Sequence, residues 1–241
     1  TLIDADSAQI EARVLAWLAE QDDLTKAFTD GEDVYVKMAS RIYNKAEEDV
    51  TKEERFVGKT TILGAGYGMG ALKFQSQLKT FGSDMPIDEA RRVINIYRES
   101  NWKINKLWRD AQQILIGLHR NDRVMHLGRG RVLITVPEEN AIRLPSGLLM
   151  RYEDLDYDQG EKGIEFHYKT RLGRNRIYGG KVIENVCQAI ARCIIGEQML
   201  EINKKHRAVL TVHDSIVCCV KDEEVTDAQK YIEECMRWTP E

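Results

Sequence analysis

The sequence predicts an α+β fold in which a long helical middle separates short strands near the two ends of the chain. Three observations support this class. Residues 2–6 read as a short strand that ends in carboxylates. Apolar residues recur at helical spacing through most of residues 8–119. Residues 208–220 hold two apolar runs around the turn His213-Asp214-Ser215. Sheet pieces this far apart in a chain of 241 residues are typical of an α+β domain with a sizeable core.

The individual elements follow from periodicity and from capping residues. Helices are expected over residues 8–19, 24–29, 34–43, 51–63, 88–99, 104–118, 181–203 and 225–237. Thr51 and Glu54 have the spacing of a capping box, and Asn101 is a candidate cap for the helix that follows it. Strands are expected over residues 2–6, 132–136, 148–152, 164–168, 208–212 and 216–220. The Gly/Arg-rich stretch 171–180 is predicted to be a loop.

The charge of the chain is unevenly distributed. The formal net charge is −4, which taken alone disfavours a nucleic-acid partner. Divided by position, it is −7 in residues 1–50, +7 in residues 51–131 and −4 in residues 132–241. A basic block of this kind is either a solvated helical surface or an anion-binding one, so the total excludes neither.

The cysteines and the hydropathy indicate the compartment. No two of the five cysteines form a C-x-x-C pair, so we expect reduced, mostly buried thiols in a cytoplasmic protein. A zinc site that combines them with His206 and His213 is disfavoured by the ligand spacing. No apolar run approaches the ~18 residues of a membrane span, so no membrane partner is expected.

Two carboxylates stand out by their position. Asp6 ends an apolar strand, and Asp214 lies in the turn of an apolar hairpin. A charge beside core strands is disfavoured unless it is paired or binds a metal. If the two segments meet across one small sheet, the pair suits Mg²⁺, which binds a few carboxylates together with substrate phosphates. The alternative is that both residues are ordinary turn or cap groups.

A second candidate site lies on the helix over residues 51–63. Arg55, Lys59 and Leu63 are four residues apart and therefore share one broad face. Two cations above an apolar contact suit a triphosphate with a sugar below it, although a solvated face with ordinary ion pairs has the same pattern. The alternate glycines of residues 64–70 do not match a phosphate-binding loop; they allow a sharp turn and the close approach of a flat group to Tyr67.

Together these segments resemble the polymerase region of family A DNA polymerases, the polymerase I-like group, and above all its phage members. Residues 6–13 read DSAQIEAR, similar to the family's D-x-S-Q-I-E-x-R. Residues 55–68 are similar to R-x3-K-x3-[FY]-G-x2-Y-G, and residues 212–215 are similar to V-H-D-E. The motifs occur in the family's order and the resemblance spans nearly the whole chain. It implies the polymerase right-hand fold, with mostly helical fingers inserted between strands of a small antiparallel palm sheet.

The resemblance also implies the reaction. Asp6 and Asp214 match the palm carboxylates that hold two Mg²⁺ ions, with the backbone carbonyl of Ser7 as a further ligand. One ion would activate the 3′-hydroxyl of a DNA primer and the other would bind the triphosphate of a dNTP. Attack on the α-phosphate releases pyrophosphate. The implied activity is template-directed DNA synthesis in the replication of phage DNA, located in the host cytoplasm.

Further roles are carried over position by position. Arg55 and Lys59 match the cations that grip the triphosphate, and Lys59 could protonate the leaving group. Glu11 matches the residue that fills the space of a 2′-hydroxyl, which implies a preference for deoxyribonucleotides. The other positions assigned to the nucleotide are Gln9, Tyr35, Leu63 and Tyr67. The positions assigned to the primer–template DNA are Arg13, Asn185, Gln188 and His213.

Several positions depart from the family pattern. Ser7-Ala8 replaces the usual pair, and Leu63 replaces the aromatic residue near the sugar. Tyr35 stands where many members have His, and Ser215 replaces an acid, which leaves two acidic candidates instead of three. Glu184 stands where many members have Asn, so Asn185 is named as a local substitute.

The expected domains follow from the motifs. Residues 1–30 and 186–241 are expected to form part of the palm, and residues 31–185 the fingers, with a β-rich segment at about 131–170 that extends them. The chain begins with Thr1 and matches neither a thumb nor an exonuclease, so it is expected to be a fragment or one piece of a split enzyme whose partner is the remainder of the polymerase.

Two other functions are compatible with these residues. A single-subunit RNA polymerase uses the His-Asp-Ser form found at residues 213–215, but Glu11 opposes it because a 2′-hydroxyl needs that space. A catalytically incomplete fragment that only binds nucleic acid is the other, since truncation alone could remove activity.

Overall fold

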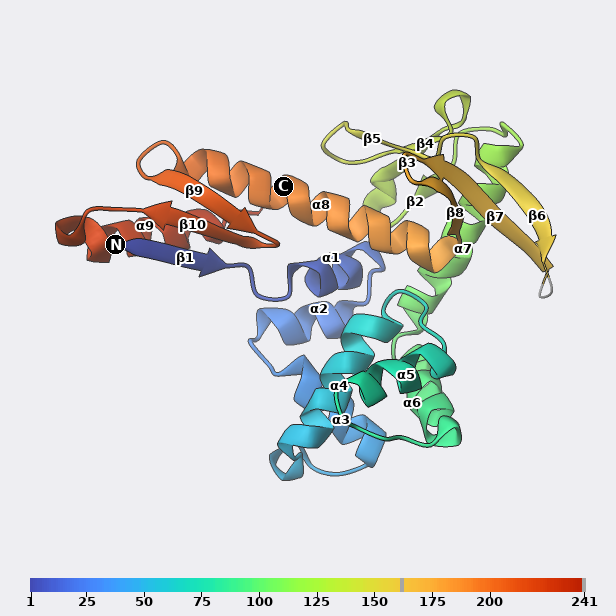
Figure 1. Ribbon diagram of the computed structural model, residues 1–241, viewed down its shortest axis with the longest axis horizontal. Helices are drawn as coiled ribbons and strands as arrows, with labels where there is room; N and C mark the ends of the chain where they lie inside the picture. The colour runs from blue at the N-terminus through green and yellow to red at the C-terminus, as the bar shows by residue number, and fades with distance from the viewer. Residues whose placement is uncertain (161–162, 240–241) are drawn as a thin grey trace. The chain divides into compact units, whose positions relative to one another are not determined.

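The computed structural model describes residues 1–160 and 163–239 and divides into two compact units (Figure 1). The first unit comprises Thr1–Val14 and Cys187–Glu241, and the second comprises Leu15–Val186. Both boundaries fall inside helices, namely α1 (Ile10–Leu18) and α8 (Gly179–Ile202). The division differs from the predicted domain limits at residue 30, because it assigns the second half of α1 and all of α2 to the second unit.

The first unit is built on a three-stranded antiparallel sheet in the order β1-β10-β9. Its elements are β1 (Leu2–Asp6), β9 (Arg207–Val212), β10 (Ser215–Cys219) and helix α9 (Val225–Met236), and Figure 1 shows the three strands side by side. Ile216 and Cys218 of β10 are fully buried, as is Ile232 of α9. These apolar contacts hold the sheet and the helix together as one core.

The helices of the second unit supply most of its core. They are the second half of α1, α2 (Asp22–Thr29), α3 (Val34–Tyr43), α4 (Lys52–Ala65), α5 (Ala71–Thr80), α6 (Ile87–Ser100), α7 (Trp102–His119) and the start of α8. Helices α3 and α4 approach closely at Gly58, where an added Cβ would lie 2.2 Å from the carbonyl oxygen of Tyr35. Only glycine permits this approach, which brings the backbones of the two helices into contact.

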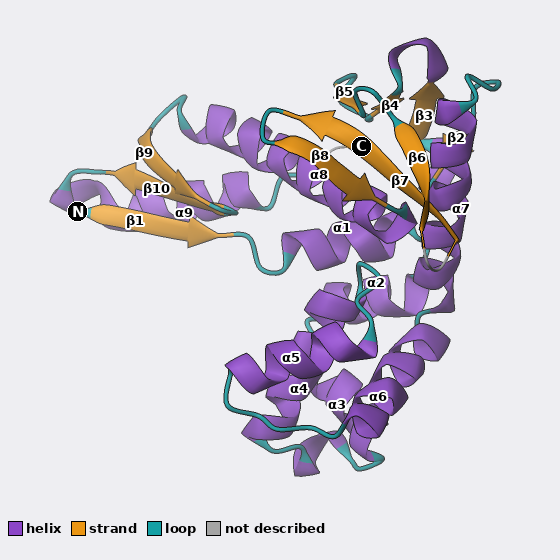
Figure 2. Ribbon diagram, turned by 45° about the vertical axis from the view of Figure 1, so that its right-hand side comes forward, coloured by secondary structure: helices purple, strands orange, loops and turns teal. Residues whose placement is uncertain are grey.

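The β-rich segment of the second unit forms two antiparallel sheets, drawn in orange in Figure 2. One sheet has the order β2-β3-β4-β5 and the other has the order β6-β7-β8. Their strands are β2 (His126–Leu127), β3 (Leu133–Val136), β4 (Ala141–Arg143), β5 (Leu149–Arg151), β6 (Asp156–Gly160), β7 (Gly163–Thr170) and β8 (Gly173–Ile177).

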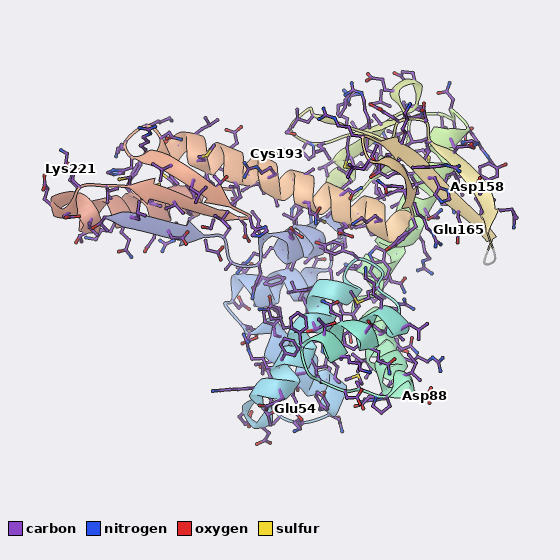
Figure 3. All side chains as sticks on the ribbon, viewed as in Figure 1. Glu54, Asp88, Asp158, Glu165, Cys193 and Lys221 are labelled. Carbon is purple, nitrogen blue, oxygen red and sulfur yellow. The ribbon has the colours of Figure 1, made fainter. Side chains whose placement is uncertain are left out.

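The β6-β7-β8 sheet has one apolar and one charged face. Phe166 and Ile177 lie opposite each other and are buried, and the ring of Phe166 packs at 6.0 Å from that of His119 on α7. On the other face the Arg174 Nη1–Asp158 Oδ2 distance is 2.8 Å, and Arg176 and Glu165 are equally close; Figure 3 labels both acids. These pairs balance the charges of the exposed face.

The predicted α+β class is confirmed, and most predicted elements lie within a few residues of the observed ones. Helix α3 has the predicted bounds, and the capping box of Thr51 and Glu54 is present at the start of α4. Strand β1 also has the predicted bounds, and the other predicted helices and strands are all present.

Two predictions of local structure were wrong. The stretch 171–180 is not a loop, because β8 occupies Gly173–Ile177 and α8 begins at Gly179. Strand β8 is Arg-rich and mostly exposed, so it lacks an apolar alternation and is held by its pairing with β7. The Asn101 side chain does not cap α7; its amide donates to the carbonyl of Tyr97 at 3.0 Å.

Besides β8, the described residues contain one α-helix and three strands that were not predicted. They are helix α5 and strands β2, β4 and β6. Helix α5 buries Phe74 and Leu78 and follows Gly70, which offers no side-chain cap. Strands β2 and β4 are short and β6 is mostly exposed, so none of the three shows a clear alternation of apolar and polar residues.

Most of the cysteines are buried, as predicted. Cys187, Cys218 and Cys235 are buried, and all five thiols are free. Burial raises the pKa of the Cys218 thiol, with a further contribution from Cys235. Within the described ranges, no helix has the length and apolar character that a bilayer span requires.

The glycine at the α3–α4 contact generates a stability prediction. We expect Gly58→Ala to lower the free energy of unfolding by about 1–3 kcal/mol, because the new methyl group must push α3 and α4 apart. The control is Gly196→Ala in α8, where an added Cβ meets open space and should stabilise the helix by about 0.5–1 kcal/mol. Urea unfolding measures both, and a Gly58→Ala variant as stable as the wild type would contradict the packing.

Candidate active site

The first unit brings the two predicted carboxylates together. Strand β1 pairs with β10 so that Asp6 lies opposite Ser215, the residue that follows Asp214. The Ser7 amide donates to the Asp214 carbonyl at 3.2 Å, which fastens the end of β1 to the hairpin turn. The carboxyl group of Asp214 is close enough to raise the pKa of Asp6.

The hairpin turn explains why Asp214 faces β1. Strands β9 and β10 are joined by only two residues, His213 and Asp214, and His213 has a φ of 54°. A positive φ at the first residue suits a tight two-residue hairpin, whose twist matches that of its strands. The short loop holds Asp214 at the end of the sheet, next to β1, and it leaves His213 exposed.

The electrostatics of the pair favour a bound cation. Partial burial raises the pKa of Asp6, and the neighbouring charges of Asp214 and Asp4 raise it further. Like charges held this close repel each other unless a proton or a metal ion neutralises them.

The donor set, all oxygen atoms, suits a hard divalent cation such as Mg²⁺. Throughout residues 1–160 and 163–239, no cluster of three or more His, Cys, Asp and Glu side chains is arranged to hold a metal ion. Two carboxylates with a neighbouring backbone carbonyl match Mg²⁺, which keeps several waters and completes its shell with phosphate oxygens.

The residues after β1 form a tight entry into α1. Gln9 has a φ of 58° and immediately precedes the helix, and its carbonyl accepts from the Arg13 amide at 3.0 Å. The Arg13 Nε donates to the Ala8 carbonyl at 2.8 Å, so this side chain folds back on the turn. Glu11 is half-buried in the first turn of α1.

The cation pair lies in the second unit, on α4. Lys59 and Leu63 are both exposed, Leu63 to 41%. Arg55 is half-buried, and its Nε donates to Asp33 Oδ2 at 2.7 Å. Within the part of the chain that the structure describes, Lys59 makes no ion pair, so its ammonium faces solvent.

Asp33 is a residue that sequence reasoning missed. Its other carboxylate oxygen accepts from the backbone amides of Tyr35 and Val36, so it caps α3 while it holds Arg55. Burial alone would raise the pKa of Asp33, but the hydrogen bond from Arg55 and those from the two amides outweigh it and lower the pKa. The cap position was readable from the sequence; the contact with Arg55, 22 residues away, was not.

Tyr35 lies beneath Arg55. Its side chain is buried, with 5% exposed, and the Arg55 guanidinium lies 5.3 Å from the centre of the ring. The close approach at Gly58 fixes this arrangement, because it sets the distance between the two helices. The guanidinium is thereby held by a carboxylate on one side and an aromatic face on the other.

The end of α4 is fixed by glycines. Gly68 has a φ of 81°, which makes the sharp turn after Tyr67, and the Gly66 carbonyl accepts from the indole of Trp108 at 2.9 Å. An added Cβ on Gly180 would lie 2.7 Å from the Tyr67 carbonyl, so the backbone of the half-buried Tyr67 packs directly on the start of α8.

A pocket that sequence reasoning did not find opens beside this turn. It has a volume of about 280 Å³. Its lining includes Gly68, Arg98, Trp108, Arg109 and Tyr178. No periodic pattern indicates it, because its residues come from four separate segments that the fold collects.

The two candidate residues on α8 have different surroundings. Gln188 is exposed in the first unit. Asn185 belongs to the second unit, where it lies near the buried Tyr152. Burial raises the pKa of Tyr152, and Asn185 offsets part of that rise. Glu184 forms a pair with Lys181 at 2.7 Å.

The chain is similar to known proteins over nearly all of its length. Residues 1–241 match the family described as DNA polymerase family A. The DNA polymerase of Bacillus phage SP02 is 29% identical over 88% of this chain and 34% of its own length. DNA polymerase I of Helicobacter pylori strain J99 is 25% identical over 96% of this chain and 22% of its own length.

A solved structure has the same fold. The POL domain of Pol1 from M. smegmatis, in complex with a DNA primer-template and dNTP, matches 98% of this chain and 36% of that chain with a TM-score of 0.63 at 22% identity. The chain spans about a third or less of the length of these relatives. Because the family match extends from the first residue to the last, the chain belongs to DNA polymerase family A.

Proposed function

We propose that this chain carries the nucleotidyl-transfer site of a DNA polymerase that copies a DNA template. The reaction joins a dNTP to the 3′-hydroxyl of a primer and releases pyrophosphate, in the replication of DNA, with phage DNA as the proposed substrate. The observation that carries the proposal is the meeting of Asp6 with Asp214 across β1 and β10 in a family A chain. The solved relative holds primer-template DNA and dNTP, which supports the same partners here.

The domain roles follow. We assign residues 1–30 and 186–241 to the palm and residues 31–185, with their two small sheets, to the fingers. The division into compact units supports the palm role of the β1-β10-β9 sheet. The remainder of the polymerase is a proposed partner, since the relatives extend well beyond the matched region. The proposed location is the cytoplasm of the host.

Asp6, Asp214 and the carbonyl of Ser7 would hold two Mg²⁺ ions. When bound, these ions supply charge that favours the ionised primer hydroxyl and neutralises the phosphates. The protein's own contribution is the fixed spacing of the two carboxylates, which the β1–β10 pairing and the Ser7–Asp214 hydrogen bond maintain.

The α4 residues would bind the incoming nucleotide. Arg55, already oriented by Asp33, offers a guanidinium to the phosphates, and the exposed Lys59 can donate a proton to the departing pyrophosphate. Leu63 would contact the sugar and Tyr67 the base. Gln9, Glu11 and Tyr35 complete the proposed nucleotide set, with Glu11 excluding a 2′-hydroxyl.

The proposed DNA contacts are polar and mostly exposed. They are Arg13, Asn185, Gln188 and His213. Exposure of Gln188 and His213 in the first unit supports a role toward the primer terminus. Arg98 and Arg109 in the pocket beside Gly68 add two cations suited to a phosphate backbone.

The raised pKa of Asp6 generates a stability prediction. A carboxyl whose pKa is higher in the folded state stabilises the fold at low pH, and this contribution is lost as the pH rises above about 4 and through the raised pKa. At neutral pH without divalent cations, Asp214→Asn should therefore be more stable than the wild type by less than about 1 kcal/mol.

Magnesium should reverse this order. At a Mg²⁺ concentration ten times the Kd, the wild type should gain about 1.4 kcal/mol and Asp214→Asn nothing. Thermal unfolding of the 241-residue chain at pH 4–8, with and without MgCl₂, measures both effects. Equal stabilisation of the two proteins by MgCl₂ would contradict the assignment.

Activity tests the roles of Asp214 and Lys59. With the remainder of the polymerase supplied, Asp214→Asn should lower the rate of primer extension about 1,000-fold, equivalent to ~4 kcal/mol. Lys59→Ala should lower it about 100-fold, with a changed dependence on high pH. Lys79→Ala, an exposed lysine of α5, is the matched control. Wild-type rates in Asp214→Asn would exclude the proposed site.

Leu63 offers a test of sugar contact. Leu63→Phe should change the incorporation of chain terminators relative to dNTPs by about fivefold, equivalent to ~1 kcal/mol. The side chain is exposed, so the larger ring can be accommodated without repacking the core. Leu72→Phe, on the even more exposed Leu72 of α5, is the control. An unchanged ratio in Leu63→Phe would show that Leu63 does not face the sugar.

A further inference from the structure

A third carboxylate lies beside the proposed metal site. In a strand, alternate residues point to the same face, so Asp4 and Asp6 share one face of β1. Residues directly opposite in an antiparallel pair also share a face, and Asp6 lies opposite Ser215 while Asp4 lies opposite Val217. Asp4, Asp6 and Ser215 therefore occupy one face of the sheet.

Ser215 connects this carboxylate to the neighbouring strand. Its hydroxyl donates to Oδ1 of Asp4, on the diagonal of the strand pair. Ser215 is 8% exposed and is the residue next to Asp214. The hydrogen bond thus joins Asp4 to the strand that presents Asp214.

The contact places a carboxylate close to a position where this sequence lacks the acid of the family motif. Ser215 stands where the motif V-H-D-E has its final acid, so β10 itself carries one carboxylate fewer. The structure holds a carboxylate next to that position, from Asp4 on the adjacent strand. The negative charge is present on the same face, but another strand contributes it.

We propose that Asp4, acting through Ser215, is a positioning residue for the divalent-cation site of Asp6 and Asp214. The inference rests on the proposed function and extends it. Asp4 fixes the Ser215 hydroxyl and thereby the start of β10, and its charge attracts a cation to the site. Partners of this kind, which bind the neighbours of metal ligands, commonly contribute tenfold or more to metal affinity.

The geometry favours this indirect role over direct ligation. One oxygen of Asp4 already accepts the Ser215 hydroxyl. Among the described residues, Asp4, Asp6 and Asp214 do not form a three-ligand cluster. A carboxylate outside the ligand set still adds Coulomb attraction at short range.

A purely structural cross-link between β1 and β10 is the alternative. Such a link would change the stability of the fold but not the affinity for a cation. A double variant that exchanges the two residues, Asp4→Ser with Ser215→Asp, helps to distinguish a role in cation binding from a purely structural role. It keeps one hydroxyl and one carboxylate on this face but moves the carboxylate to β10.

The test is a Mn²⁺ titration of the 241-residue chain, followed by the electron paramagnetic resonance signal of free Mn²⁺, with Mg²⁺ as competitor. Asp4→Asn and Ser215→Ala should each weaken Mn²⁺ binding about tenfold. The double exchange should restore the affinity to within about threefold of the wild type. Asp227→Asn removes an exposed carboxylate of α9 and should change nothing. Thermal unfolding without cations verifies that each variant is folded.

The outcomes separate the inference from the proposed function. Wild-type affinity in Asp4→Asn and Ser215→Ala, together with lost binding in Asp6→Asn and Asp214→Asn, would overturn the role of Asp4 and leave the metal site intact. Wild-type affinity in Asp4→Asn and Ser215→Ala with a lowered thermal stability would assign the contact to structure alone, and a double exchange that binds as weakly as the single variants would contradict the interchange of the two positions. Unchanged binding in Asp6→Asn would remove the proposed metal site and the role of Asp4 with it.

Discussion

Strand β1 pairs with β10, whose first residue lies more than 200 positions further along the chain. The first unit depends on this antiparallel pairing. It sets Asp6 opposite Ser215 and fastens Ser7 to Asp214, so that a one-residue slip would turn Asp6 to the other face. The buried apolar side chains of Ile216 and Cys218 favour this register, because a slip would move them to the face that carries Ser215. Apolar burial on one face of the sheet therefore determines which charges meet on the other.

In the second unit, the close packing of two helices determines where the charged groups lie. Close contact at Gly58 sets the separation of α3 and α4, and this separation places Tyr35 and Asp33 around the Arg55 guanidinium. Lys59, one turn further along, has no such partner in the described part of the chain. One cation is therefore held in a fixed orientation, and its neighbour is exposed to solvent.

The sequence predicted several helix limits that depend on neighbouring residues. Asp33 and Asn44, which has a left-handed backbone conformation, cap the two ends of α3, and Thr51 with Glu54 caps the start of α4. The limits of these helices could therefore be predicted from neighbouring residues. The three motifs also predicted the family, which the match over residues 1–241 confirms. What the sequence could not provide were contacts between distant side chains. The Asp33–Arg55 and Asp4–Ser215 hydrogen bonds have no spacing rule, and β8 exists because β7 pairs with it, not because of its own pattern.

The hydrogen bond between Ser215 and Asp4 also bears on how such proteins are compared. A comparison that scores one position at a time counts Ser215 as a lost acid and gives no weight to Asp4, which lies outside the motif. On the folded sheet the two positions are a diagonal pair on one face, and the carboxylate of that pair lies on β1. A count of acids within single motifs therefore misses a carboxylate that the fold brings next to the motif.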